Sequence, residues 1–234
     1  MDNKFTVIKG NADVENVNKL MRSLTVYDCW KRQYHNAIYK AMSNNKGKKI
    51  EDYPQEDLKR IALSGIKYIN SICEIRRENE RAGTVCEKSL KESQETFDLI
   101  DAIFMIMGYL TPKNFVNTFP ITKEYDGEKW QSKDYFYTMD ALAKMDWNKP
   151  IGRDKISDLL WDYQNDDLRE VYVEYMCVVS ALYRAQTDKG IAEQFCDDMG
   201  IPTYSFDKKN GTLKNNKTGQ VTRAKKNSYL KRVK

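Results

Sequence analysis

Two glutamates one helical turn apart form the clearest carboxylate pair in the sequence. Glu92 and Glu95 have the ExxE spacing, which places both side chains on one face of a helix. Oxygen ligands paired in this way can hold a divalent cation. Asp98 and Asp101 continue the same face. If this segment carries chemistry, that chemistry is metal-assisted hydrolysis. The other interpretation is the solvated edge of a central helix.

The segment around Glu92 and Glu95 resembles the first half of the metal site in all-helical nucleotide pyrophosphohydrolases of the MazG kind. The resemblance implies a helical nucleotide hydrolase that uses these two carboxylates. That family also has an ExxD pair on a later helix, and no such pair follows here. We keep the hydrolase as the second alternative function.

Other catalytic arrangements lack their residues. His35 is the single histidine, so every histidine-dependent triad or metal site would have to use it. The five cysteines are odd in number and include no CxxC pair, which predicts free, buried thiols. No glycine-rich phosphate loop is present. We therefore predict that the protein is not an enzyme and has no catalytic residue, no metal and no cofactor.

The strongest positive signal is a split of charge along the chain. Residues 208–234 hold ten Lys and Arg and no Asp or Glu, whereas residues 1–207 hold 29 basic and 34 acidic residues. A basic segment of this density seeks phosphate or an acidic protein surface. Tyr204, Phe206 and Tyr229 could stack on bases. The predicted nucleic-acid or partner-binding residues are Lys208, Lys209, Lys214, Lys217, Arg223, Lys225, Lys226, Tyr229, Lys231 and Arg232.

Two further segments are candidate protein contacts. Residues 125–137 mix aromatic and charged side chains, which suits a contact surface, although Trp130 could instead fill the core under a loop. An acidic cluster consists of Asp162, Asp166, Asp167, Glu170 and Glu174. Its carboxylates either favour a helix N-terminus or receive a basic tail. The predicted protein-contact residues are Trp130, Tyr135, Asp162, Asp166 and Asp167.

Hydrophobic periodicity predicts a mainly α fold. We expect an irregular bundle of about seven helices with a small C-terminal β-hairpin or meander and a basic tail. The expected domains are a helical body at 1–200 and a basic β-hairpin with tail at 201–234. A capping box at Thr84–Glu87 predicts a helix that runs to Leu110. Two apolar stripes, one through Phe104 and one through Ile103, predict that this helix is buried on most sides and central. We expect residues 111–132 to be irregular. The other expected helices cover about 11–42, 52–81, 132–145, 156–163, 165–182 and 188–199, with strands near 5–8, 204–206, 212–214 and 220–222.

Composition narrows the class of protein. The longest apolar stretch, 103–110, is too short to span a membrane. The first residues of the sequence lack the basic and apolar regions of a signal peptide. Lys/Asn-rich patches are typical of AT-rich genomes, including those of phages. We therefore expect a non-enzymatic assembly or connector protein of a bacteriophage particle, located in the host cytoplasm or the assembled virion. Its expected partners are copies of itself, other phage structural proteins, and DNA or RNA through the tail. The alternative is a phage or mobile-element protein that inhibits or recruits a host nucleic-acid machine.

Overall fold

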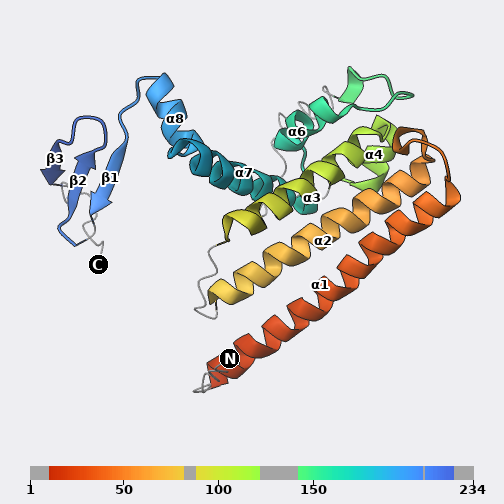
Figure 1. Ribbon diagram of the computed structural model, residues 1–234, viewed down its shortest axis with the longest axis horizontal. Coiled ribbons are helices and arrows are strands. Elements are labelled where there is room, and N and C mark those ends of the chain that lie inside the picture. Colours follow the sequence, from red (N-terminus) through yellow and green to blue (C-terminus); the bar gives the residue numbers. More distant parts are fainter. Residues whose placement is uncertain (1–10, 82–87, 122–141, 208, 224–234) are drawn as a thin grey trace, which may run out of the picture. The chain divides into compact units, whose positions relative to one another are not determined.

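The structure, a computed structural model, describes residues 11–81, 88–121, 142–207 and 209–223 (Figure 1). These residues form seven α-helices and a three-stranded antiparallel sheet near the C-terminal end, which confirms the predicted fold class. The expected strand at 5–8 and most of the expected helix at 132–145 lie outside the described residues. In chain order the elements are α1 (Asn11–Asn44), the 3₁₀-helix η1 (Ile50–Asp52), α2 (Gln55–Arg81), α3 (Leu90–Gly108), α4 (Pro112–Thr118), α6 (Arg153–Asp162), α7 (Asp166–Thr187), α8 (Ile191–Asp198), β1 (Tyr204–Asp207), β2 (Thr212–Asn215) and β3 (Val221–Arg223).

The two longest helices, α1 and α2, form an antiparallel hairpin, and α2 lies between α1 and α3 (Figure 1). Small side chains allow the first contact, because Ala37 and Ala41 of α1 are buried against α2. Gly65 allows the second. A Cβ at this position would lie 2.7 Å from the Cδ1 atom of Ile103 on α3. The central position that we expected for α3 is therefore shared with α2.

The third helix begins later than its sequence suggests. Ser89 is the N-cap of α3, because its hydroxyl accepts a hydrogen bond from Glu92 N at 3.2 Å. The Glu92 carboxylate in turn accepts from Ser89 N at 2.7 Å, which completes a capping box. The start predicted at residue 84 is therefore wrong, although the Thr84–Glu87 box itself lies outside the described residues.

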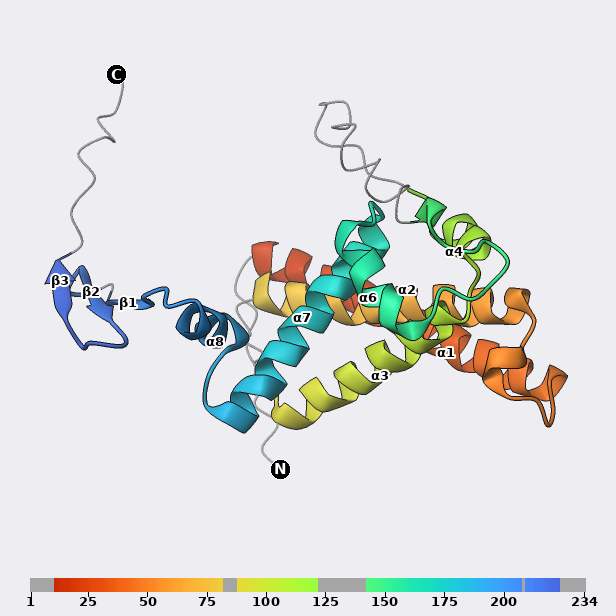
Figure 2. The ribbon, with the colours of Figure 1, turned by 90° about the horizontal axis from the view of Figure 1, so that it is seen from above.

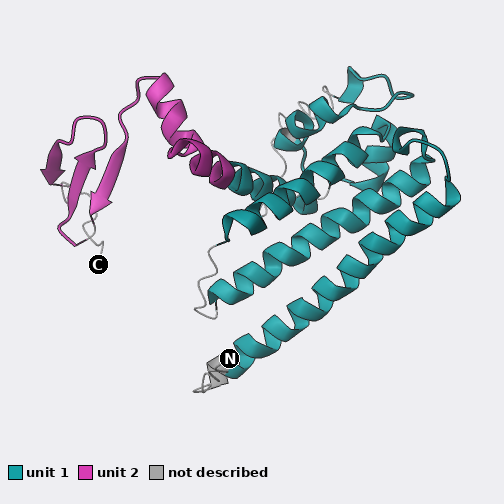
Figure 3. Ribbon diagram, viewed as in Figure 1, with its two compact units in different colours: residues 1–179 teal, residues 180–234 magenta. Residues whose placement is uncertain are grey.

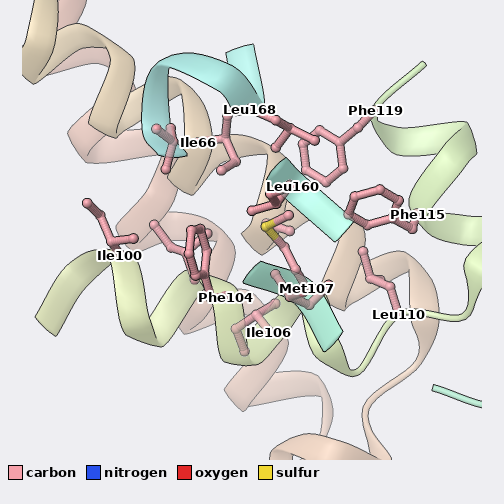
Figure 4. Packing of buried hydrophobic residues seen from close by; sticks show 14 of the residues in the cluster. Ile66, Ile100, Phe104, Ile106, Met107, Leu110, Phe115, Phe119, Leu160 and Leu168 are labelled. Atoms are coloured by element: carbon pink, nitrogen blue, oxygen red, sulfur yellow. The ribbon is translucent and has the colours of Figure 1, made fainter. Parts of the chain in front are cut away.

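The second half of α3 supplies the centre of the hydrophobic core. Ile100, Phe104 and Met107 are fully buried. Figure 4 shows Phe104 and Met107 close to Leu160 of α6. Two stripes of apolar residues on α3 predicted this burial, and the prediction is confirmed for its C-terminal half.

A short helix occupies part of the segment that we expected to be irregular. In α4, Pro112 holds the first position and Thr111 caps the helix by accepting a hydrogen bond from Asn114 N at 3.4 Å. Phe115 and Phe119 are buried, and the Tyr163 hydroxyl donates to Phe119 O at 2.5 Å. The start of α4 could have been predicted from the sequence, because Thr followed by Pro is a common helix start.

The close packing of α3 on α6 predicts a strong effect at Gly108. A Cβ at this residue would lie 2.7 Å from Arg153 N and 2.9 Å from Arg153 Cα, which are backbone atoms and cannot rotate away. We expect Gly108→Ala to lower the free energy of unfolding by about 1–3 kcal/mol. Gly190→Ala is the matched control, since the atoms nearest to its Cβ would be the ends of the exposed Arg184 and Glu193 side chains, which can rotate away. Equal denaturation midpoints for the two variants would contradict this packing.

The chain separates into two compact units, residues 1–179 and 180–234 (Figure 3). The end of α7 and all of α8 belong with the sheet, so this division falls earlier than the expected boundary at residue 200. The predicted domain boundary at residue 200 stays a prediction. Among the described residues, no helix is both long enough and apolar enough to cross a membrane.

Candidate nucleic-acid interface

Three short strands within the described residues 204–223 form a meander that includes the first part of the basic segment. β1 pairs with β2 in the register Phe206↔Leu213, and β2 pairs with β3 in the register Leu213↔Thr222. Gly211 and Gly219 lie in the two turns with φ of +61° and +71°, a conformation that side chains disfavour. The predicted meander is confirmed, and its pairing decides which side chains share a face.

One face of the sheet carries exposed aromatic rings. Tyr204 and Phe206 are two residues apart on β1 and therefore point to the same side. Their residues are 53% and 55% exposed. Across the ladder they face Asn215 and Leu213. The described part of the second unit thus leaves half of each aromatic residue open to a partner.

The opposite face carries two of the predicted basic residues. Lys214 and Arg223 are both exposed, and they share this face with Val221. The only acidic residue of the sheet, Asp207, is engaged locally, because its carboxylate accepts hydrogen bonds from the backbone N–H groups of Lys209 and Asn210. Because Lys214 and Arg223 outnumber the ionised Asp207, this face keeps a net positive charge.

The two turn lysines lie at opposite ends of the sheet. Lys209 is exposed in the turn between β1 and β2, whereas Lys217 lies in the turn between β2 and β3. Lys217 shares a surface cleft of about 580 Å³ with the α8 carboxylates of Glu193 and Asp197. Lys209 is thus better placed than Lys217 to meet an external anion. The other predicted binding residues lie outside the described residues: Lys208, Lys225, Lys226, Tyr229, Lys231 and Arg232.

The acidic cluster predicted as a protein contact is largely paired within the helical unit. The first part of α7 crosses α2 (Figure 2). There Lys67 Nζ lies 2.5 Å from Asp167 Oδ2, and Asn70 donates to the same carboxylate at 3.2 Å. Asp166 is exposed, and the side chain of Asp162 is outside the described part. Trp130 and Tyr135 also lie outside it.

The same interface holds a buried carboxylate. Glu174 on α7 is 1% exposed and lies 2.6 Å from Arg76 Nη1 of α2, while Lys88 Nζ donates to its other oxygen. Burial alone would raise the pKa of Glu174. The hydrogen bond and charge of Lys88, together with the charge of Arg76, outweigh burial and hold the pKa below its usual value of 4.5. Glu174 therefore stays ionised and joins α7 to α2.

A second pair strengthens the α2–α7 contact. Arg77 binds Glu170 with both terminal nitrogens, at 2.9 and 3.3 Å. The sequence indicated the acidic side of this interface but not the basic side. Arg76 and Arg77 read as the polar end of a helix, and only the fold brings them opposite α7. A spacing of four residues between Glu170 and Glu174 was the available signal, because it places both on one face.

The carboxylate pair that could have carried hydrolysis is used for other purposes. Glu92 caps α3, and the hydrogen bonds from Ser89 lower its pKa. Glu95 is exposed and lies 3.7 Å from Lys91. Across 11–81, 88–121 and the other described stretches, no group of three or more His, Cys, Asp or Glu side chains could hold a metal ion.

The remaining titratable candidates are ordinary surface or core groups. His35 is exposed on α1, and its ring lies 5.7 Å from the Tyr34 ring, centroid to centroid, at an interplanar angle of 54°. Cys73 is buried, and burial, followed by the charge of Glu174, raises its pKa to about 12. Cys29 and Cys177 are exposed, so the prediction of buried thiols is wrong for these two residues. Both cysteines lie on long helices, and other side chains of these helices form the buried faces.

Comparisons with protein-family models, curated proteins and solved structures find no match to this chain.

Proposed function

We propose that this protein is a non-enzymatic assembly or connector protein whose C-terminal sheet and basic tail bind nucleic acid. The main support for this proposal is the small sheet, which exposes Lys214 and Arg223 on one face. Its single carboxylate, Asp207, is held by local hydrogen bonds. A surface of this kind attracts phosphate without needing a catalytic group.

The pairing of the α7 carboxylates supports nucleic acid over an acidic protein surface as the partner of the tail. Asp167, Glu170 and Glu174 already bind Lys67, Arg77, Arg76 and Lys88 of the same helical unit. A second basic segment would have to displace these cations to dock there. Phosphate groups outside the molecule meet no such competitor.

Charge reversal on the sheet tests the proposal. We expect Lys214→Glu/Arg223→Glu to weaken binding of the full chain to DNA and to reduce its salt dependence. The slope of log K against log salt should fall by about 1.4 with single strands or about 1.8 with duplex, since two phosphate contacts are removed. Fluorescence anisotropy of labelled DNA at several salt concentrations measures the slope.

The control carries the same change of charge elsewhere. Lys40 and Lys113 are exposed on the helical unit, and Lys40→Glu/Lys113→Glu should leave the slope unchanged. Light scattering at low and high salt, with and without DNA, then reports whether the protein assembles on the nucleic acid. Equal slopes for the two double variants would contradict the proposed interface.

A further inference from the structure

The open aromatic face of the sheet points to the form of nucleic acid that binds. We infer that the sheet recognises single strands, with Tyr204 and Phe206 stacking on two successive bases. The inference rests on the proposed function and adds the class of ligand. Its basis is that both residues lie on one face of β1 and remain more than half exposed. Aromatic side chains of single-strand-binding proteins stack on bases of any sequence.

The spacing of the two rings separates single strands from duplexes. Residues i and i+2 of a strand are about 6.7 Å apart. Along one strand of a duplex, successive bases are about 3.4 Å apart and already stacked on each other. Two bases can each cover one ring only if the nucleic acid strand is extended and unstacked. A duplex would present its phosphates but not its base faces to Tyr204 and Phe206.

The surroundings of the rings suit a polyanion. Among the described basic residues of the sheet and its turns, Lys214 and Arg223 lie on the face opposite the rings, whereas Lys209 and Lys217 lie in the turns at the two ends of the sheet. Lys209 lies in the turn that follows Phe206 and can reach a phosphate beside a stacked base. Asn215 lies opposite Tyr204, and its side-chain oxygen holds the next turn by accepting hydrogen bonds from Lys217 N and Thr218 N. Leu213 lies on the same face as the rings, between Phe206 and Thr222 in the strand pairing.

The test compares two ligands and two variants of the full chain. The ligands are an oligodeoxythymidine of about 20 nucleotides and a duplex of the same length. The first variant is Tyr204→Ala/Phe206→Ala. The control is Val221→Ala, which removes an equally exposed apolar side chain from the opposite face of the same sheet. Anisotropy at several salt concentrations gives each affinity, and circular dichroism confirms that both variants are folded.

We expect the parent chain to prefer the oligodeoxythymidine. Loss of each ring should weaken single-strand binding by about five- to a hundred-fold, while duplex binding and the salt slope stay as they were. Val221→Ala should match the parent. Equal affinity of the parent for both ligands, or an unchanged affinity in the ring variant, overturns the inference but leaves the proposed function standing.

Two other results would distinguish failure of the proposed function from failure of the single-strand inference. If the parent binds neither ligand, the proposed nucleic-acid contact fails together with the inference. If the ring variant keeps its affinity for the oligodeoxythymidine but loses self-association in light scattering, the aromatic face contacts protein, and the inference is overturned.

Discussion

Replacing Phe104 with alanine is expected to lower the free energy of unfolding by about 3–5 kcal/mol. The ring is fully buried, lies 5.3 Å from the Tyr175 ring, and has the Arg153 guanidinium 5.5 Å from its centroid. Truncation would therefore leave a cavity where α3, α6 and α7 meet. A loss of this size approaches the whole stability of many domains. Urea denaturation followed by circular dichroism measures it.

A polar residue one turn earlier provides the comparison. The Asp101 carboxylate binds Arg153, and the Asp101 side chain is 46% exposed. An ion pair this accessible to water contributes little, so Asp101→Ala should cost about 1 kcal/mol or less. If Asp101→Ala proved the more damaging of the two, the core would not be centred on the C-terminal half of α3.

The second large effect is expected at Glu174. Glu174→Gln should lower the free energy of unfolding by about 3 kcal/mol, because it leaves Arg76 and Lys88 packed around a neutral group. Glu95→Gln is the matched control. Its carboxylate is exposed and 3.7 Å from Lys91, so the expected change is below about 0.5 kcal/mol. Similar urea midpoints for the two variants would show that Glu174 does not join α7 to α2.

The same carboxylate predicts a dependence on pH. The pKa of Glu174 is lower in the folded chain than its ordinary value of 4.5. Its contribution is therefore fully present above that value and is lost as the pH falls through the lowered pKa. Between about pH 5 and pH 3, the parent should lose stability more steeply than Glu174→Gln. Parallel slopes for both proteins would contradict this origin.

The long helices could be recognised from the sequence because their signals are local. Apolar residues recur at helical spacing through α1, α2 and α7, and Asn165 caps α7 by accepting a hydrogen bond from Leu168 N. The start of α3 was misplaced because two capping signals lie five residues apart, and the Ser89–Glu92 box caps the helix. The α4 helix was missed because a seven-residue helix shows too little periodicity.

Some properties of the candidate site could also be predicted from local sequence, and others could not. Composition by itself determined that the C-terminal segment is basic, and the turn residues Asn210-Gly211 and Thr218-Gly219 determined that it forms a meander. Those properties depend on residue type and near neighbours. Only the strand register decided that Tyr204 and Phe206 share one face and that Lys214 and Arg223 share the other.

The acidic cluster shows the limit of sequence reasoning most clearly. Counting charges identified Asp167 and Glu174 but could not tell an open patch from a buried one. Tertiary packing decided this by bringing α2 and Lys88 against α7, across about a hundred residues of sequence in the case of Lys67 and Asp167. Charge composition adds up along the chain, whereas the partner of each charge depends on which helices the hydrophobic core brings together.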